Sequence, residues 1–373
     1  MSGTAIGQVI HSTGRVLPET SALLRDHVRP AARRSAHYLD RYDRHTLYFD
    51  CVYLPEDGSY LFTAPRLLNL WKPFRAGLSV DGKPVGRVRR RTWLRYEQVT
   101  VRAPAGRLRL NFDGDDQPVV ARPSLAPAFA GLNCLLTVNK NNDLDWIANW
   151  AAYHVAAQGA NGVILFDNGS TAYGVQDICA ALSGLAGLKT AVVYAAPYPY
   201  GPSDKSSRFE VSPRFFQSAM LNIARRDALS GARAVLNIDI DEVVRRTDGG
   251  PSAFDLATQN PLGMVMIDGT WAYPGPEATG PVGHAAHVWQ QVPPRGCNPK
   301  WCAVPGGWMS RLGWSVHQIG PVRVPPTTAQ TQVQLLHCRG TSTGWKSQRF
   351  KTPKTLEHSA ELARFMARNF PCI

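Results

Sequence analysis

The stretch Ala234-Val-Leu-Asn-Ile-Asp-Ile-Asp-Glu242 decides how the rest of this chain is interpreted, because an apolar strand ends there in carboxylates. Asp239 and Asp241 are two residues apart, so on an extended backbone they share one face while Ile238 and Ile240 point into a core. Mg²⁺ and Mn²⁺ take oxygen ligands, usually one or two carboxylates together with substrate phosphates. The stretch therefore predicts a site for Mn²⁺ or Mg²⁺ at a strand end.

The tripeptide Asp-x-Asp occurs twice more, so its context has to select among the three copies. Asp113-Gly-Asp115 lies in a polar run typical of a turn. Asp143-Leu-Asp145 lies at the start of an expected helix, where acidic residues suit the helix dipole. The third copy, Asp239-Ile-Asp241, ends a buried strand, the position at which α/β sheets bind their ligands.

Length and composition indicate an ordered globular protein. A chain of 373 residues exceeds the usual size of a single core, and 44% hydrophobic with 18% charged residues excludes a disordered chain. Neither a membrane-spanning apolar stretch nor a signal-peptide pattern is visible, so a cytoplasmic location is expected. Seven irregularly spaced cysteines fit a reducing compartment.

The net charge of +13 permits attraction to nucleic acid, anionic lipid or phosphorylated substrates, or reflects a generally basic surface. Residues 1–130 hold 20 Lys+Arg against 12 Asp+Glu, a net +8, so the excess is concentrated towards the N-terminus. The run Arg87-Val-Arg-Arg-Arg91 is its densest part and can meet phosphates or act as a charged sheet edge.

The pattern changes along the chain, and four regions are expected. They are a helical or irregular segment (1–45), a β-sandwich-like accessory domain (46–125), an α/β domain (131–350) and a C-terminal helix (351–373). The accessory domain can bind a carbohydrate or partner, or can act as a spacer. In the α/β region, strands are expected at 133–139, 163–166, 190–194, 234–236 and 263–268, and helices at 143–158 and 212–229.

The order of pieces in residues 132–350 resembles the Rossmann-like GT-A fold of nucleotide-sugar-dependent glycosyltransferases, in particular family-2-like and family-92-like members. The matching stretches are Lys140-Asn141-Asn142, Asp145-Trp146 with His154, Asp167-Asn168-Gly169-Ser170 and Asp239-Ile240-Asp241-Glu242-Val243. Asn142 stands where these relatives have Glu, and Val243 where they have an aromatic residue. The resemblance implies a mixed α/β sheet with helices on both faces. The small β-rich region that precedes it is expected from its strand pattern alone.

A nucleoside diphosphate sugar is the donor that the resemblance implies. Asp167, with Asn168 and Ser170 beside it, can hydrogen-bond a base or ribose, or can hold its own loop as an Asx-turn. Asn139, Lys140 and Asn141 can likewise bind the base or cap the following helix.

A metal ion is expected to neutralise the charge that grows on the leaving diphosphate. Asp241 would hold the metal, and Asp239 would be shared between the metal and the ribose. His337, in a segment similar to the His-Tyr-Arg of these relatives, ranks above His317 as a further ligand. The expected diphosphate or acceptor contacts are Lys300, Arg339, Lys346 and Arg349.

Inversion at the anomeric carbon would need a carboxylate base for the acceptor hydroxyl. Asp268 and Glu277 are the nearest acids after the expected strand, and Glu277 is favoured because a Gly/Pro loop carries it. Glu277 can equally be an exposed loop acid. Trp271 and Tyr273 offer surfaces for stacking on a sugar.

Two further patterns suggest other roles. His284, His287, Cys297 and Cys302 could form a zinc site, although the cysteine spacing is long. Residues 355–370 form an amphipathic pattern that can lie on a membrane surface or pack against the core, and packing is expected.

The sequence thus predicts a metal-dependent, inverting glycosyltransferase that moves a sugar from a nucleoside diphosphate to a glycan or lipid-linked acceptor, as in polysaccharide biosynthesis. No specific nucleic acid partner is expected, and the basic charge permits peripheral contact with the inner face of a membrane. The alternatives are a nucleotidyltransferase, which also arranges carboxylates around Mg²⁺, and a noncatalytic polyanion-binding protein.

Overall fold

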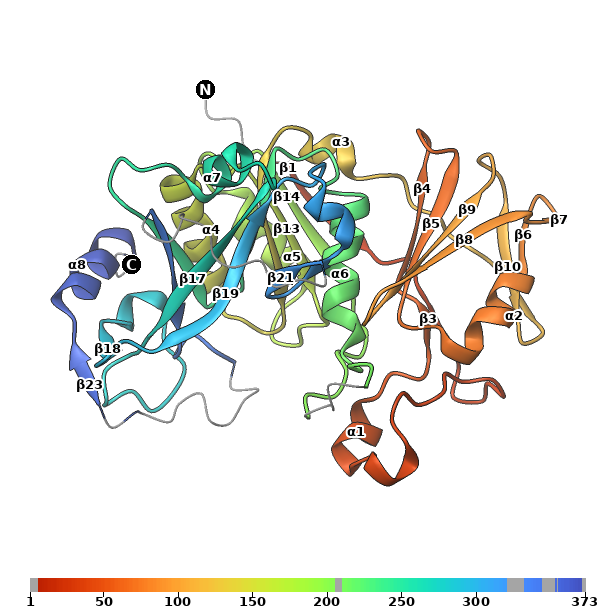
Figure 1. Ribbon diagram of the computed structural model, residues 1–373, viewed down its shortest axis with the longest axis horizontal. Coiled ribbons are helices and arrows are strands. Elements are labelled where there is room, and N and C mark those ends of the chain that lie inside the picture. The colour runs from red at the N-terminus through yellow and green to blue at the C-terminus, as the bar shows by residue number, and fades with distance from the viewer. Residues whose placement is uncertain (1–5, 205–209, 321–331, 344–352, 354, 371–373) are drawn as a thin grey trace. The chain divides into compact units, whose positions relative to one another are not determined.

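The structure is a computed structural model that describes residues 6–204, 210–320, 332–343, 353 and 355–370 (Figure 1). The chain divides into two compact units. Unit 1 comprises residues 1–10, 128–195 and 229–373, and unit 2 comprises 11–127 and 196–228. The units are discontinuous in sequence, unlike the consecutive domains expected, because residues 196–228 leave the α/β region and join the N-terminal part of the chain.

Unit 1 is built on a nine-stranded mixed sheet with the order β1-β14-β13-β12-β15-β19-β17-β22-β16. The strands are β1 (Ile6–His11), β14 (Thr190–Ala195), β13 (Gly162–Asp167), β12 (Asn133–Asn139), β15 (Ala234–Asn237), β19 (Gly296–Ala303), β17 (Met264–Ala272), β22 (Val333–Cys338) and β16 (Glu242–Arg246). Strands β14, β13, β12 and β15 pair in parallel, so their carboxyl ends lie at one edge. The mixed α/β class expected from the sequence is confirmed.

Three helices pack on this sheet: α4 (Leu144–Gln158), α5 (Val175–Ser183) and α7 (Ala253–Gln259). Helix α4 begins where the Asp143 side chain accepts the Asp145 N–H, and it ends at Gly159, whose φ of 73° suits glycine. Its buried Ile147 and Trp150 share one apolar core with the sheet and the other two helices. The Asp143-x-Asp145 tripeptide is therefore a helix start, as predicted.

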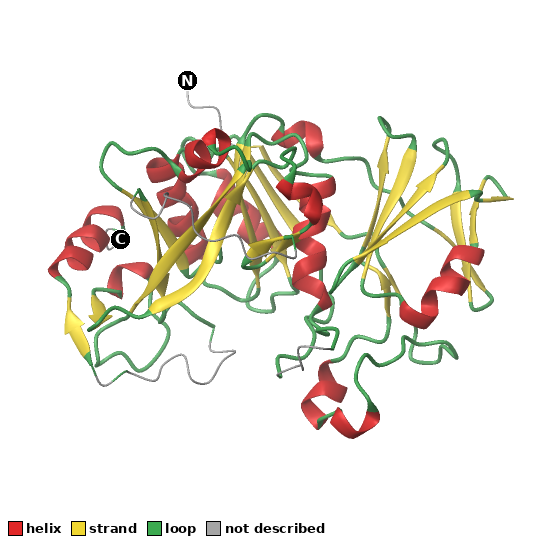
Figure 2. Cartoon of the chain, viewed as in Figure 1, coloured by secondary structure: helices red, strands yellow, loops and turns green. Residues whose placement is uncertain are grey.

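Unit 2 contains two four-stranded antiparallel sheets that share one core (Figure 2). One sheet runs β4 (Asp50–Leu54), β5 (Ser59–Ala64), β9 (Glu97–Arg102), β8 (Arg87–Thr92), and the other β11 (Asp115–Pro118), β10 (Leu108–Phe112), β6 (Leu78–Val80), β7 (Lys83–Pro84). Helices α2 (Trp71–Ala76) and α6 (Phe215–Arg226) also belong to this unit. The expected small β-rich region is confirmed, and Asp113-Gly114 forms the predicted turn.

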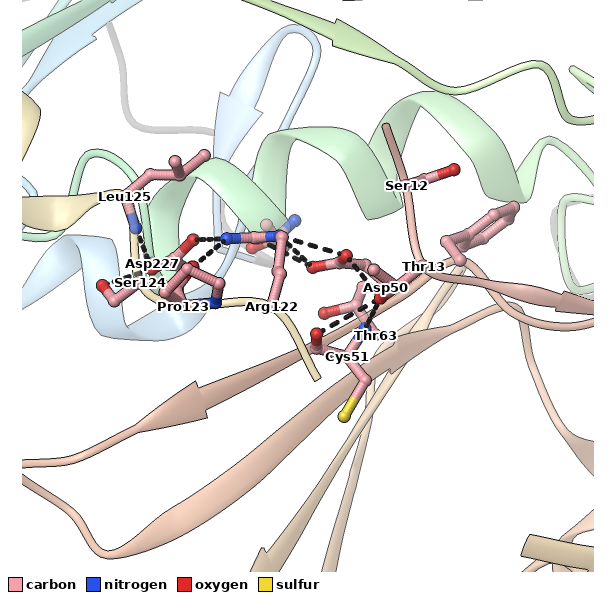
Figure 3. Close-up of polar contacts among 12 residues, drawn as sticks. Ser12, Thr13, Asp50, Cys51, Thr63, Arg122, Pro123, Ser124, Leu125 and Asp227 are labelled. Carbon is pink, nitrogen blue, oxygen red and sulfur yellow. Dashed lines mark hydrogen bonds and ion pairs between the residues drawn. The ribbon is translucent and has the colours of Figure 1, made fainter. Parts of the chain in front are cut away.

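A buried ion-pair cluster joins three separate segments of unit 2 (Figure 3). The Arg122 guanidinium lies 2.8 Å from Asp50 and 2.6 Å from Asp227, and the three side chains are between 1% and 7% exposed. Ser124 Oγ and the Leu125 N–H also donate to Asp227. Each buried charge thus has a charged partner, which burial requires.

Residues 21–42, part of the segment expected to be helical or irregular, do not form one continuous helix. The structure has a 3-10 turn, η1 (Ala31–Arg33), and a short helix α1 (Ala36–Arg41) that begins where Ser35 Oγ accepts the Tyr38 N–H. Pro30 has an extended ψ of 147° and interrupts the helical backbone. The segment is therefore irregular apart from these two short elements.

The remaining elements are short or peripheral. They are β2 (Arg15–Val16), β3 (Thr46–Tyr48), η2 (Leu68–Leu70), α3 (Ala126–Phe129), η3 (His284–Ala286), β18 (Trp289–Gln291), η4 (Met309–Leu312), β20 (Trp314–Ser315), β21 (Gln318–Ile319), β23 (Leu356–His358) and α8 (Ala360–Asn369). Leu362 and Met366 of α8 are buried in unit 1, so this helix packs as expected. Within the described residues, none of the helices combines the length and hydropathy needed to cross a bilayer.

Candidate cation and substrate site

The acidic stretch that follows β15 is a turn and not a strand. Strand β15 ends at Asn237, and β16 begins at Glu242. The Asp239 N–H donates to Glu242 Oε2 at 2.8 Å, and the Glu242 N–H returns a hydrogen bond to the Asp239 carbonyl. The expected extended backbone is wrong because these two bonds close the turn, although Ile238 and Ile240 are buried as predicted.

Lys300 of β19 supplies a cation to this turn. Its ammonium group lies 2.8 Å from Asp239 Oδ2 and 3.0 Å from Glu242 Oε2, and its side chain is fully buried. The Asp239 side chain remains 36% exposed. Lys300, proposed from the sequence as a diphosphate contact, is thus held by two carboxylates of the protein itself.

Burial and charge act in opposite directions on this pair. Burial raises the pKa of Glu242 to about 7, while the Lys300 charge opposes the shift. Burial by itself lowers the pKa of Lys300, but Asp239 and Glu242 outweigh it and the net pKa is raised. The lysine is therefore charged at neutral pH, and its proximity favours the ionised form of Glu242.

His337 of β22 approaches the same turn from the other side. Its Nε2 lies 3.1 Å from Asp241 Oδ2 and its Nδ1 lies 3.4 Å from Glu242 Oε1. Glu242 and His337 are direct cross-strand neighbours in the β16–β22 pair. The position of the imidazole is thus fixed by sheet register.

Asp241, Glu242 and His337 each offer a ligand atom, and these atoms lie within 4.8 Å of one another. Carboxylates suit Mg²⁺ and Mn²⁺, whereas an imidazole also suits Zn²⁺. Among the described residues, these three are the His, Cys, Asp and Glu side chains that lie close enough together to bind one metal ion. The donor set fits a divalent cation, and Asp241 and His337 were both predicted from the sequence.

Aromatic and cationic groups surround His337. The Trp271 ring of β17 lies 3.9 Å from the His337 ring between centroids, and the Arg339 guanidinium lies 5.4 Å from the Trp271 ring. Tyr273 is 2% exposed and donates a hydrogen bond to Gln291, so the expected sugar-stacking role of Tyr273 is wrong for this structure. Trp271 instead packs on the imidazole.

His317 lies in the short connection between β20 and β21. This connection is tied to the sheet, because Asn237 Nδ2 donates to the Val316 carbonyl and Trp301 Nε1 to the Ser315 carbonyl. Burial lowers the pKa of His317 to about 4, with the nearby Lys300 charge acting in the same direction. The imidazole is thus neutral at pH 7, although it is outside the compact Asp241 group.

The carboxyl ends of β12 and β13 carry a closed hydrogen-bond network. Asp167 Oδ1 accepts from Asn139 Nδ2 at 2.8 Å and from Ser170 Oγ at 2.5 Å, and Asp167 Oδ2 accepts from the Ser170 N–H. Asp167 and Asn139 are 2% and 1% exposed. Asp167 therefore holds its own loop, and any ligand contact would have to come from the more exposed residues around this network, here called its rim.

The rim of this network is more accessible. Asn141 has a positive φ of 56°, and its Oδ1 accepts the backbone N–H groups of Thr171 and Ala172. Lys140 is exposed, whereas Asn168 is 4% exposed. Lys140 is thus the predicted nucleoside-binding residue with a side chain open to solvent.

Asp268 and Glu277 occupy different surroundings. Asp268 lies at an irregularity of β17, between Ile267 and Gly269, and is half-buried. Glu277 is exposed in the loop after β17. Both remain predictions as catalytic bases, and Lys346 and Arg349 lie outside the described residues.

The alternative zinc site is not assembled among the described residues. His284 Nε2 contacts the Ile240 carbonyl, and His287 Nε2 accepts the Gly340 N–H, so both rings serve the backbone. Cys297 and Cys302 are free thiols on β19. Burial lowers the pKa of His287 to about 3, which keeps this ring neutral.

Sequence reasoning missed two features of the site. Glu242 follows the Asp-x-Asp and is interpreted from the sequence as a buried structural acid or a partner of the metal ligands, yet it also offers a ligand atom of its own to the compact group. The contact of Trp271 with His337 was missed because it depends on the parallel β17–β22 pairing. The adjacency of Glu242 to Asp241 was the available signal for the first, and the sequence carried none for the second.

Comparison with known proteins gives weak similarity. No protein-family model matches the chain, and no curated protein matches it. Two structures of the galactosyltransferase LgtC, one an active-site mutant and one a complex with donor and acceptor sugar analogs, match at 13% and 12% identity with a TM-score of 0.29. Each match covers 64% of this chain and 97% of LgtC. A mycobacterial protein matches at 13% identity and a TM-score of 0.22, over 48% of this chain and 56% of its own. Such scores are too low to assign a family or an activity.

Proposed function

We propose that this protein is a divalent-cation-dependent glycosyltransferase that uses a nucleoside diphosphate sugar and a glycan or lipid-linked acceptor. The observation that carries the proposal is the group Asp241, Glu242 and His337 at the carboxyl edge of the parallel strands. That edge is where open α/β sheets bind nucleotides and their phosphates. Mn²⁺ or Mg²⁺ is the proposed cation because two of the three donor side chains are carboxylates.

The charge of the site supports this proposal. Asp239, Asp241 and Glu242 contribute three carboxyl groups and Lys300 one ammonium, so the group has a net charge of −2 once Glu242 is ionised. A divalent cation balances that charge. Such a cation would neutralise the charge that develops on a leaving nucleoside diphosphate.

The residues divide into two roles. Asp241 and His337 would hold the cation, with Glu242 fixing the orientation of His337 from the neighbouring strand. Asp239 is tied to Lys300 through Oδ2 and is partly exposed, so it would accept a hydrogen bond from a hydroxyl of the donor. Arg339 and Lys140 would contact phosphate and nucleoside respectively.

The catalytic base that would act on the acceptor is proposed from its position in the chain and its exposure. Glu277 is our first candidate for the base that removes the proton of the acceptor hydroxyl in an inverting reaction, and Asp268 is the second. Glu277 is exposed on a Gly/Pro loop, which suits a residue that must reach an incoming acceptor. Replacing each with its amide would separate them, because loss of the base lowers the transfer rate without weakening donor binding.

Donor screening with Mn²⁺, Mg²⁺ and Zn²⁺ tests the proposal. We expect one nucleotide sugar to be hydrolysed slowly without acceptor, releasing a nucleoside diphosphate, and Asp241→Ala to abolish the release. Asp145→Asn is the matched control, since Asp145 belongs to another Asp-x-Asp and is exposed on α4. Release of pyrophosphate would indicate nucleotidyl transfer instead. Full activity of Asp241→Ala, or no binding of any donor, would contradict the proposal.

A further inference from the structure

The hairpin of β8 and β9 in unit 2 presents a row of arginines. Arg87, Arg89 and Arg91 alternate along the edge strand β8, so they share one face of the sheet, and all three are exposed. The opposite face of β8 carries Arg90, which lies 2.7 Å from Glu97. The exposed arginines therefore belong to a different surface from the buried ion pair.

Like charges are placed opposite each other on this surface. Arg87 of β8 is the direct cross-strand neighbour of Arg102 of β9, and both are exposed. Direct opposition of like charges destabilises a sheet. Glu97 is the acidic residue of the hairpin sequence, but it is fully buried between Arg66 and Arg90. The hairpin thus provides no carboxylate to its exposed face.

Helix α6 adds further arginines at the tip of the hairpin. Arg91 and Arg225 lie 4.6 Å and 5.7 Å from the Trp93 ring, which stacks on Tyr96. Burial lowers the pKa of Arg225 to about 10, and the charges of Arg226 and Arg91 contribute to the shift. The guanidinium groups are therefore close enough to repel one another.

The same crowding affects Arg95, the next arginine of the tip. Its Nε is buried without a hydrogen-bond partner. Burial lowers the pKa of Arg95, and the Arg214 charge acts in the same direction. Arg95 and Arg214 therefore add to the positive charge at the tip.

An apolar side chain projects beside this charge. Leu94 is 62% exposed at the turn, which is closed by the hydrogen bond from the Trp93 N–H to the Tyr96 carbonyl. Nucleic acid offers phosphates but no hydrocarbon phase for such a residue. An anionic bilayer offers both, because arginines near the surface bind headgroups while an apolar residue enters the acyl boundary.

We propose that the β8–β9 hairpin of unit 2 docks on the phosphate headgroups of an anionic phospholipid bilayer, with Leu94 inserted. The name "arginine hairpin" is used below for Arg87, Arg89, Arg91, Leu94 and Arg102. This surface is independent of the candidate cation site. It places the membrane contact on unit 2 and not on the C-terminal helix, which packs in the core of unit 1.

Vesicle co-sedimentation tests the proposal on the full chain. The probes are phosphatidylcholine vesicles and vesicles of phosphatidylcholine with phosphatidylglycerol. We expect binding to the anionic vesicles only, weakening with salt. Each arginine near an anionic surface is worth about fivefold in affinity, so Arg87→Gln/Arg89→Gln should weaken binding about 25-fold. Leu94→Ser should weaken binding at high salt, where the charge contribution is screened.

The matched control is Arg41→Gln/Arg107→Gln, which removes the same charge from two other exposed positions. The control should bind like the unchanged protein, and circular dichroism should show all variants folded. Equal loss in both double variants would overturn the proposal, since total charge would then suffice. Binding of duplex DNA or free inositol hexakisphosphate in place of vesicles would overturn it as well, because the occupant would not be a bilayer.

Discussion

Lys300 Nζ and Asp239 Oδ2 form a 2.8 Å ion pair between residues 61 positions apart in the sequence. The lysine side chain is fully buried, so the pair is formed where water competes little. The first Asp of the Asp-x-Asp is thereby occupied by the protein's own cation, while Asp241 faces His337. The two acids of one tripeptide therefore have different partners.

Loss of the buried lysine should destabilise unit 1. Lys300→Met leaves Asp239 and Glu242 without their counter-charge, and breaking a buried pair from one side costs about 3–5 kcal/mol. The double variant Lys300→Met/Glu242→Gln should recover part of the loss because it removes one buried charge. Urea unfolding gives both values. Equal stability of Lys300→Met and the unchanged protein would contradict the burial of this pair.

Divalent-cation binding should depend on Asp241 and not on Asp239. Asp241→Asn or His337→Gln should weaken Mn²⁺ binding by at least about tenfold, since each removes a ligand atom from the compact group. Asp239→Asn should leave the affinity nearly unchanged, because its Oδ2 is bound by Lys300. Electron paramagnetic resonance of free Mn²⁺ measures this without substrate. If Asp239→Asn abolished binding, Asp239 would be a ligand as the sequence first suggested.

Buried neutral histidines should make stability fall in mild acid. His154 Nδ1 donates to the Trp150 carbonyl and Nε2 accepts the Val244 N–H, so the neutral tautomer is fixed. Burial lowers the pKa of His154 to about 3. As the pH falls from 6.5 towards that value, His154 is protonated in the unfolded chain but stays neutral in the folded chain. The free energy of unfolding therefore falls by about 1.4 kcal/mol for each pH unit.

Urea titrations at pH 7 and pH 5 measure this effect. His154→Gln should reduce the loss of stability between the two pH values, by about 2 kcal/mol if the variant folds. The exposed His358→Gln is the matched control and should keep the pH dependence of the unchanged protein. An unchanged pH dependence in His154→Gln would refute the assignment.

Asp167 should behave as a structural residue. Asp167→Ala removes the acceptor of the Ser170 N–H and Oγ and one acceptor of Asn139 Nδ2, which costs about 1–3 kcal/mol. Exposed Lys140→Ala should leave stability unchanged and weaken nucleotide binding. Thermal unfolding and nucleotide titration of both variants distinguish the roles. Unchanged stability with lost nucleotide binding in Asp167→Ala would show that its carboxylate serves the ligand.

The Arg122 cluster should stabilise unit 2 more than its surface pairs do. Arg122→Met leaves Asp50 and Asp227 buried without their cation and should cost about 3–5 kcal/mol. Arg109, paired with Asp116 on the surface, is the control, and Arg109→Met should cost under about 1 kcal/mol. Denaturant unfolding compares the two, and similar losses would contradict this account.

The sequence by itself determined the local elements that carry the site. Strand β12 was predicted with its observed bounds, and helix α4 with its start at Asp143 and its end at Gly159. Apolar runs, helical periodicity and capping residues act between neighbours in the chain, so they are visible without a fold. The acidic turn after β15 was visible for the same reason, whereas His337 was proposed from its similarity to the His-Tyr-Arg segment of the glycosyltransferases that the chain resembles.

Only the tertiary structure decided which groups meet. Sheet order brings Lys300 to Asp239 and sheet register brings His337 to Glu242, while Trp271 reaches His337 through a parallel pairing. The turn at Asp239 replaced the expected strand because a side chain, Glu242, could accept the backbone N–H. Residues 196–228 joined unit 2 although their sequence suggested the α/β domain. These outcomes depend on contacts between distant segments, and no pattern among sequence neighbours encodes them.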